Sequence, residues 1–567
     1  MNIFTKLKLF AHVMHWRMTW EKYDLHHPSP VKDNPKFMTA WEAVKLIPDG
    51  AVVGTSGIGG NQRCSLMYWA IRDSFLQDGH PRDLTVVNIG GQGGRGKVPG
   101  TVEELGLEGL NTRLVVSHTE TFKKQLELAQ ADKMEIHCTL FGSVTFALRA
   151  QGEGQEYIIN DTGAGTFVDP RVGPGTRVWP PDAPQFVEIT EDGRFKYWLP
   201  PVDTAVFAAP AADRAGNIYF KNCSFIGESY SLAKAARTHN GRTIVNVGMI
   251  VDEGYDDEFL PADLVDAVVY WPDTEQTVTI KQRKYWDCFT PHSTLPIDEG
   301  LARTRYINNI LRVMSSRLPV DEALARLGTR VFVDNAHKGD HVDIGIGHPE
   351  VVARLLHESG AMKDLNMINE SGAFGGVAAP GIFFGAAINP DEIVPSVKAF
   401  DRMYKRLDWV ILGALEVDSA GNVNVSKRGE GPINHVGPGG FIDLCTCAEN
   451  ILFCCSWFDH GEIQVQGNQM KVVKPGKPKF IEKVLEITFN GQEGLKQGKN
   501  VFYITHVCAF RLTKRGMELI YVMPGVDVQK DIIDVCPMKI VLPEAGAPKT
   551  AGTEIVTGEN FHFELND

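Results

Sequence analysis

The chain has 567 residues, more than one hydrophobic core usually serves, with 43% hydrophobic and 22% charged residues. This composition excludes general disorder and indicates at least two globular domains. Acidic residues outnumber basic ones by 70 to 57, which gives a net charge of −13. A nucleic acid or an anionic membrane is therefore disfavoured as a partner, because either would need a basic face.

Residues 1–36 precede the first predicted sheet, and their first half predicts a helix. Apolar side chains recur there at helical spacing, at Ile3, Leu7, Phe10, Met14 and Met18. Basic residues stand beside them and no acidic residue occurs before Glu21, as in a targeting or membrane-surface helix. Because no small-residue cleavage site follows, we expect instead a helix packed on the body of the protein or on a partner subunit.

Beyond Pro35, short β-branched runs alternate with helical patterns, which predicts a parallel sheet with crossover helices. Cys64 to Leu76 predicts a helix. Strands are expected at residues 51–54, 84–88, 243–247 and 267–270.

A second series of elements begins near residue 300. A helix is expected over Leu301–Leu318, and strands at residues 331–333, 342–344, 367–368 and 409–412. Two turns, Ala212–Ile218 and Val417–Val423, share a D-x-x-G-N pattern after an apolar strand. This echo predicts two related open α/β domains, Rossmann-like and with mostly parallel sheets, over residues 37–300 and 301–545. Residues 546–567 are expected to be a loose tail.

Ten cysteines are scattered along the chain without a C-x-x-C pair. This pattern favours reduced, mostly buried thiols in a cytoplasmic protein over a zinc cluster or a disulfide framework. The longest apolar stretch, Gly375–Ile388, contains Pro380 and several glycines, so it is too short and too broken to span a bilayer.

The segment Gly91–Lys97 satisfies two nucleotide-binding patterns, G-x-G-x-x-G and G-x-x-x-x-G-K. A dinucleotide site needs a helix that opens at the glycines, and Val98-Pro-Gly does not open one. A triphosphate loop needs Ser or Thr after the lysine to hold magnesium, and Val98 has no hydroxyl. The segment therefore fits neither kind of nucleotide-binding site. Its Gln92 side-chain amide could still form a hydrogen bond with a carbonyl or a carboxylate.

Glu370 follows a short predicted strand and is flanked by Gly372, Gly375 and Gly376. Ligands of open α/β sheets gather at the carboxyl ends of the strands, so this carboxylate is well placed to touch a substrate. A helix cap or an ion pair is the structural alternative. Glu350 and Glu358 are rivals, although Glu358 falls at the end of a predicted helix.

Two further glycine clusters stand out. Gly437–Phe441 exposes consecutive backbone N–H groups, which can form an oxyanion hole or an ordinary turn. Gly163–Arg171 ends in a possible loop brace between Asp169 and Arg171.

Together these motifs resemble the family I CoA-transferases, and within them the fused, single-chain acetate, propionate and 3-ketoacid type. The resemblance covers roughly residues 37–545. It is carried in order by residues 48–53, 91–93, 163–171, 212–217, 345–350, 369–376, 384–390, 418–424 and 437–441.

The resemblance implies CoA transfer from an acyl-CoA to a free, short-chain carboxylic acid, at an active site between the two domains. Glu370 corresponds to the catalytic glutamate, which forms an acyl-glutamyl anhydride and then a glutamyl-CoA thioester. Gly437, Gly439 and Gly440 correspond to the glycines associated with CoA and oxyanion binding. Gln92 and Asn389 match polar positions of the substrate pocket. No metal or tightly bound cofactor is implied, CoA serves as substrate, and a homo-oligomer is expected.

The sequence departs from the family at Tyr503–Phe510, where His506 and Val507 replace a Glu-Arg pair. Local packing or substrate range could differ as a result. Two other functions stay open: an acyl-CoA hydrolase on the same scaffold, and a non-catalytic ligand-binding module.

Overall fold

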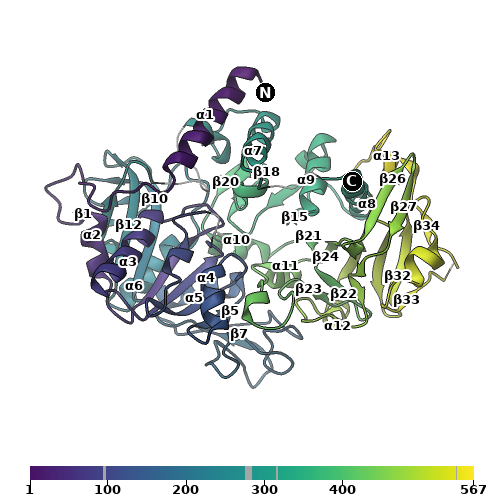
Figure 1. Cartoon of the computed structure of the whole chain (residues 1–567), viewed down its shortest axis with the longest axis horizontal. Helices are drawn as coiled ribbons and strands as arrows, with labels where there is room; N and C mark the ends of the chain where they lie inside the picture. The colour runs from purple at the N-terminus through teal and green to yellow at the C-terminus, as the bar shows by residue number, and fades with distance from the viewer. Residues whose placement is uncertain (94–97, 275–283, 314–316, 545) are drawn as a thin grey trace.

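The computed structural model describes residues 1–93, 98–274, 284–313, 317–544 and 546–567. Two sheets of eleven strands each form two α/β domains that lie side by side (Figure 1). Strands between residues 37 and 270 build the first sheet, and strands between residues 341 and 550 build the second. The prediction of two sheet-rich α/β domains is confirmed.

Most neighbouring strands of the first sheet are parallel, and the antiparallel pairs involve only the edge strand at residues 177–179 and two short strands added beside a central one. Its order is β1 (Phe37–Met38), β14 (Ala267–Tyr270), β12 (Arg242–Val251), β10 (Thr204–Asp213), β2 (Val52–Ile58), β3 (Leu84–Gly90), β4 (Asn111–Val116), β5 (Glu135–Cys138) and β7 (Arg177–Trp179). Two short strands extend it beside β10, namely β11 (Ile218–Tyr219) and β13 (Phe259–Leu260).

The second sheet has a parallel centre and an antiparallel extension at its C-terminal side. Its order is β20 (Glu392–Ile393), β17 (Ala373–Phe374), β16 (Asn366–Ile368), β15 (His341–Ile344), β21 (Trp409–Gly413), β24 (Asn450–Cys454), β30 (Asn500–Ile504), β31 (Cys508–Thr513), β32 (Gly516–Val522) and β33 (Ile540–Val541). Strand β34 (Lys549–Thr550) also pairs with β32.

Five central strands follow the same order in both sheets. Numbered along the chain, β3-β2-β10-β12-β14 and β16-β15-β21-β24-β30 are both 2-1-3-4-5 arrangements, a common doubly wound order. The two D-x-x-G-N turns are also alike, because Asp213 and Asp418 each accept hydrogen bonds from the backbone N–H and side-chain amide of the asparagine four residues on. The echo in the sequence therefore reflects two related domains.

Helices cover the two sheets and their edges, and their buried apolar side chains pack with those of the strands in the core. They are α1 (Ile3–Thr19), α2 (Ala40–Ala43), α3 (Ser65–Asp78), α4 (Lys123–Gln130), α5 (Phe141–Gly152), α6 (Ser229–Thr238), α7 (Ile297–Leu311), α8 (Pro319–Val333), α9 (Pro349–Glu358), α10 (Ser396–Met403), α11 (Phe441–Cys447), α12 (Gly491–Lys496) and α13 (Thr553–Thr557).

Smaller sheets lie outside these two. They are formed by β6 (Ile158–Asn160), β8 (Val187–Ile189) and β9 (Phe195–Tyr197); β18 (Val377–Ala378) and β19 (Ala387–Ile388); β22 (Glu416–Asp418), β23 (Val423–Asn424) and β29 (Phe480–Ile481); β25 (Phe458–Asp459) and β28 (Lys477–Pro478); and β26 (Glu462–Gln466) and β27 (Gln469–Lys474).

Three predictions about elements are wrong. Residues 331–333 are not a strand but the last turn of α8, whose apolar face continues through Leu324 and Leu327 and outweighs the strand preference of two valines. The helix expected over Leu301–Leu318 ends as α7 at Leu311, and α8 begins at Pro319. The expected loose tail is packed, because β34 pairs with β32 and Ile555 is buried.

The N-terminal helix forms as predicted, but the face that packs on the protein is not the one whose spacing predicted the helix. The five apolar residues whose spacing predicted the helix are exposed, while Leu9, Val13 and Trp16 are buried. All ten cysteines are free thiols, and eight of them are buried. None of the helices in the described part of the chain combines the length and the hydrophobicity that a membrane crossing requires.

Candidate active site

Glu370 lies at the tip of a tight hairpin between β16 and β17. The turn is closed by a hydrogen bond from the Gly372 N–H to the Asn369 carbonyl, 2.8 Å long. Gly372 has a φ of +96°, and a Cβ there would come within 2.0 Å of the Val394 carbonyl oxygen. Only glycine therefore permits the turn that brings the Glu370 carboxylate to the end of the sheet.

The Glu370 carboxylate packs against the backbone of Gly440. A Cβ on Gly440 would lie 1.8 Å from Oε2 of Glu370, so the absence of a side chain creates the space that the carboxylate fills. Oε2 is buried and has no hydrogen-bond partner among the described residues, although Glu370 as a whole is partly exposed. The backbone N–H of Glu370 donates to Oδ2 of Asp343 over 3.2 Å.

Three carboxyl groups share this buried region. Burial, together with the nearby carboxyls of Asp343 and Asp443, raises the pKa of Glu370 to about 8, against the opposing effect of the Gly440 N–H. Burial also raises the pKa values of Asp343 and Asp443 to about 7 each. Because like charges in low dielectric repel one another, the cluster holds a proton near neutral pH.

The Gly437–Phe441 segment joins the two domains beside Glu370. The Gly439 N–H donates to the Ser117 carbonyl over 2.8 Å, and the Gly437 N–H donates to the Ser426 carbonyl over 3.1 Å. Gly437 has a φ of +76°, and a Cβ there would touch Cys138 and the Ser117–His118 backbone at 3.0 Å. Two of the three predicted oxyanion donors are thus occupied in this structure, and Gly440 is the one beside the carboxylate.

Asp443, the third residue of α11, continues this junction. Its Oδ2 accepts the Gly142 N–H at the start of α5 over 3.0 Å, and its Oδ1 accepts the Tyr404 hydroxyl over 3.1 Å. A Cβ on Gly142 would approach Oδ1 to 2.6 Å, so the first domain provides a fitted contact for this carboxyl. Asp443 therefore anchors the glycine segment, and with it the wall behind Glu370.

Gln92 is fully buried at the end of β3, in the first domain. Its Oε1 accepts the Tyr68 hydroxyl over 2.8 Å, and its Nε2 donates to the Asn61 carbonyl over 2.9 Å. A Cβ on Gly57 would lie 1.7 Å from that Nε2, so the amide packs against the last residues of β2. Residues 94–97, the end of the predicted Gly91–Lys97 motif, lie outside the described residues.

Asn389 follows β19 with a φ of +50°. Its Nδ2 donates to the Leu295 carbonyl, while its Oδ1 is buried without a partner in the described part of the chain. The unsatisfied oxygen leaves this side chain able to accept a hydrogen bond from a ligand.

The rival glutamates lie elsewhere, on a cavity of about 390 Å³ between α7, α8, α9 and β18. Each faces an arginine, with Glu358 2.7 Å from Arg354 and Glu350 3.9 Å from Arg317. They are ion-pair partners in this structure, so of the three only Glu370 has a buried oxygen that no described residue pairs with.

The predicted loop brace is present. Arg171 donates two hydrogen bonds of 2.8 Å to the two oxygens of Asp169, which also accepts the Gly165 N–H.

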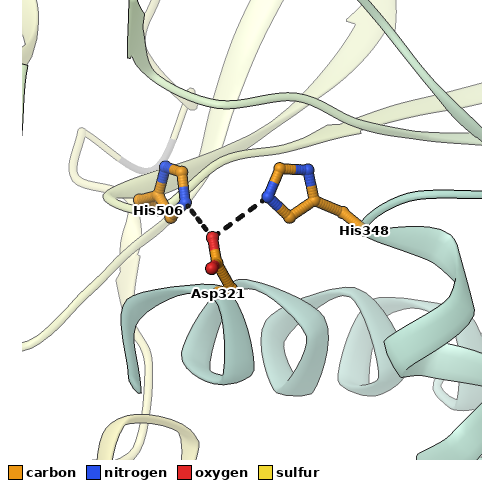
Figure 2. A group of neighbouring side chains, drawn as sticks. All are labelled: Asp321, His348 and His506. Atoms are coloured by element: carbon orange, nitrogen blue, oxygen red, sulfur yellow. Dashed lines mark hydrogen bonds and ion pairs between the residues drawn. The ribbon is translucent and has the colours of Figure 1, made fainter. Parts of the chain in front are cut away.

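Asp321, His348 and His506 form the candidate metal group of the described residues (Figure 2). Oδ1 of Asp321 lies 3.1 Å from Nε2 of His348 and 3.2 Å from Nε2 of His506. The two imidazoles come from the start of α9 and the turn after β30, and they converge on one carboxylate of α8.

The hydrogen bonds of His506 do not fit a metal ligand. Its Nδ1 accepts the backbone N–H of Trp457, so the proton of the neutral ring sits on Nε2 and points at Asp321. Burial would raise the pKa of Asp321, but the hydrogen bonds from both histidines outweigh it and hold that pKa well below the usual range. The group is a hydrogen-bonded triad that ties β30 to α8 where relatives were expected to carry a Glu-Arg pair.

The sequence reasoning missed Asp343 and Asp443. Each left a signal, since Asp343 interrupts the apolar strand Val342–Ile344 and Asp443 stands between Ile442 and Leu444. An acidic residue in an apolar run has to be satisfied or functional when it is buried.

Known proteins are similar to this chain in sequence and in fold. It is 32% identical to caffeate CoA-transferase of Acetobacterium woodii over 515 residues, 88% of this chain and 93% of that protein. It is 29% identical to acetate CoA-transferase YdiF of Escherichia coli K12 over 517 residues, 89% of this chain and 93% of that protein. No family model matches the sequence.

The fold comparison agrees. A crystal structure of the acyl-CoA transferase YdiF from Escherichia coli O157:H7, described as a thioester complex with CoA, has a TM-score of 0.81 and 26% identity. The match covers 94% of this chain and 98% of that one. The enzyme therefore transfers CoA between acyl-CoA and acids, and the chain belongs to the single-chain CoA-transferases of family I.

Proposed function

We propose that Glu370 is the nucleophile that carries CoA between an acyl-CoA and a free carboxylic acid. The observation that supports this assignment is the buried, unpaired Oε2 at the end of β16, against the backbone of Gly440. A carboxylate in such a place is desolvated and unpaired, unlike the ion-paired Glu350 and Glu358.

The chemistry proceeds in two exchanges. Glu370 reacts in its ionised form, whose share grows as the pH rises toward its pKa of about 8. This carboxylate attacks the thioester carbonyl, the C–S bond breaks, and CoA leaves as the thiolate from an acyl-glutamyl anhydride. The thiolate then attacks the glutamyl carbonyl, which forms the glutamyl-CoA thioester and releases the first acid as its carboxylate. A second carboxylate reverses both steps and leaves as the new acyl-CoA. The thioester energy is conserved throughout, and no net proton is consumed.

The site offers help for a weak nucleophile. The Gly440 N–H lies beside the reacting carboxyl, and one such donor at a developing oxyanion typically contributes about 3–4 kcal/mol. Binding energy of the CoA moiety, used in the transition state, adds to this. Asn389, with its unsatisfied Oδ1, is proposed to line the substrate pocket, and Gln92 is proposed to support it from the first domain.

The acid itself is proposed to be short-chain. Acetate, the acid in the name of YdiF, is the first to test, and caffeate, from the name of the other relative, is the larger alternative. We further propose a domain division near residue 300, a cytoplasmic location and a homo-oligomeric enzyme.

Glu370→Gln tests the nucleophile, with Glu358→Gln as the matched control. Both proteins are incubated with one acyl-CoA and no acceptor, and peptides are searched for a CoA-sized mass gain. We expect the adduct on the Glu370 peptide in the wild type and in Glu358→Gln, and no adduct and no acid exchange in Glu370→Gln. Exchange at the wild-type rate in Glu370→Gln would end the proposal. Free CoA released without an acceptor would instead indicate a hydrolase.

A further inference from the structure

Helix α1 has apolar side chains on two opposite faces. The inner face, formed by Leu9, Val13 and Trp16, is buried against α7 and the core beneath it. The other face carries six exposed apolar residues, which we call the outer stripe: Ile3, Phe4, Leu7, Phe10, Met14 and Met18. In the outer stripe Phe4 is 74% exposed and Met18 66%. A continuous exposed apolar face usually marks an interaction site, so the outer stripe calls for a partner.

Cations border the outer stripe on both sides. At 100° per residue, Lys6 and Arg17 fall on one side of it and Lys8 on the other. All three side chains are exposed, and α1 contains no acidic residue. We call these three residues the basic rim. A partner that covers the stripe must therefore present acidic groups around an apolar centre.

The charges disfavour two occupants and favour a third. Pairing α1 with another α1 would set basic rim against basic rim, and like charges at such a seam repel. The net charge of the chain is −13, and α1 contributes +3 to it, so the rest of the chain has a net charge of −16. An anionic bilayer would repel a body of this charge. The body of a second copy is, by contrast, an acidic surface that is always present with α1.

One surface of that body has the required pattern. The segment 252–258, between β12 and β13, contains five acids, Asp252, Glu253, Asp256, Asp257 and Glu258, none of which is ion-paired to a described residue. Exposed Met249 and Phe259 flank this acidic segment, at 44% and 38% exposure. Apolar side chains thus stand together with acids that have no ion pair to the described residues, as the outer stripe stands with the basic rim on α1.

We propose that the outer stripe of α1 docks on the acidic segment of a second copy of this chain, so that the enzyme assembles through a charge-matched α1 contact. The inner face holds α1 on its own body while the stripe reaches the neighbour; in Figure 1 the helix stands at the top of the molecule above α7. The inference is independent of the chemistry at Glu370.

The test compares molar mass in solution for five forms of the full chain by sedimentation velocity. The first is the wild type. The stripe variant carries Phe4→Ser, Leu7→Ser and Phe10→Ser, and the rim variant carries Lys6→Glu, Lys8→Glu and Arg17→Glu. The acidic-segment variant carries Asp252→Lys, Glu253→Lys and Asp257→Lys, and the fifth form combines the rim and acidic-segment changes in one chain. Lys471→Glu with Lys474→Glu on β27 is the matched surface control, and thermal unfolding reports that each variant folds.

We expect the wild type to be an oligomer, and each of the three single-surface variants to fall to half its mass or less. The combined variant should regain the wild-type mass, because the swapped charges match again, and the β27 control should not change. A monomeric wild type, unchanged masses in the single-surface variants, or no recovery in the combined variant would overturn the proposal. Vesicles containing phosphatidylserine provide the other arm: binding that the stripe variant loses without a change in mass would assign the stripe to lipid instead.

Discussion

Replacing Gly440 with alanine is the sharpest test of the geometry around Glu370. The backbone of Gly440 has a φ of −86°, which alanine adopts without strain, so the substitution changes only the space beside the carboxylate. The new Cβ would lie 1.8 Å from Oε2, and a normal contact of about 3.4 Å requires a shift of about 1.6 Å.

A shift of this size moves the nucleophile out of line with the thioester. Misplacing a reacting group by about 1 Å can cost about 100-fold in rate, or about 2.7 kcal/mol in the activation barrier. We therefore expect Gly440→Ala to lower kcat/KM for acid exchange by at least about 100-fold, with a normal unfolding transition.

Gly439→Ala is the matched control, one residue away. Its Cβ would meet nothing within 4 Å, but its φ of +60° strains alanine by about 1 kcal/mol. This variant should lose stability and keep most of its activity, the reverse of Gly440→Ala. Exchange rates follow a labelled acid into acyl-CoA, and stability is measured by urea unfolding. A Gly440→Ala enzyme within threefold of the wild type would refute the placement of the carboxylate.

Three further predictions concern buried charges. Asp443→Asn removes a negative neighbour of Glu370, so the pKa of Glu370 falls and the rising limb of kcat/KM against pH should move to lower pH; an unmoved limb would contradict the coupling. Burial raises the pKa of Glu228 from 4.5 to about 7, so its native state holds the proton more tightly and stability falls as pH rises through this window. Glu228→Gln should therefore stabilise the protein by about 3 kcal/mol at pH 8 and by little at pH 5 in urea unfolding, and an equal gain at both values would count against it. Asp321→Asn weakens the bonds to both histidines and should cost about 1–3 kcal/mol, whereas zinc or EDTA should leave the unfolding temperature of the wild type unchanged; a zinc-dependent rise would show that the triad binds metal.

Local patterns predicted seven strands of the two large sheets and failed where two preferences competed. Val342–Ile344 and Trp409–Leu412 are short apolar runs between turns, and both are strands of the second sheet. Val331–Val333 has the same composition, yet it ends α8, because three preceding turns already direct one apolar face to the core. The preference of three residues cannot outweigh a helix that is already formed and packed.

The same limit applies to α1. The spacing of Ile3, Leu7, Phe10 and Met14 predicted a helix, but it could not show which apolar face is buried. That depends on Leu9, Val13 and Trp16 meeting α7, which lies about 300 residues further along the chain.

What the sequence determined by itself was local and ordered: two related α/β halves, the glycine turns, and Glu370 at the end of a strand. These follow from φ preferences and from the period of apolar residues, both of which act over a few positions. The tertiary structure alone brought Asp343 and Asp443 to Glu370, placed Gly440 against its carboxylate and joined Gly142 to Asp443. These groups come from strands and helices that are distant in the sequence, and their pKa values and contacts arise only when packing removes the water between them.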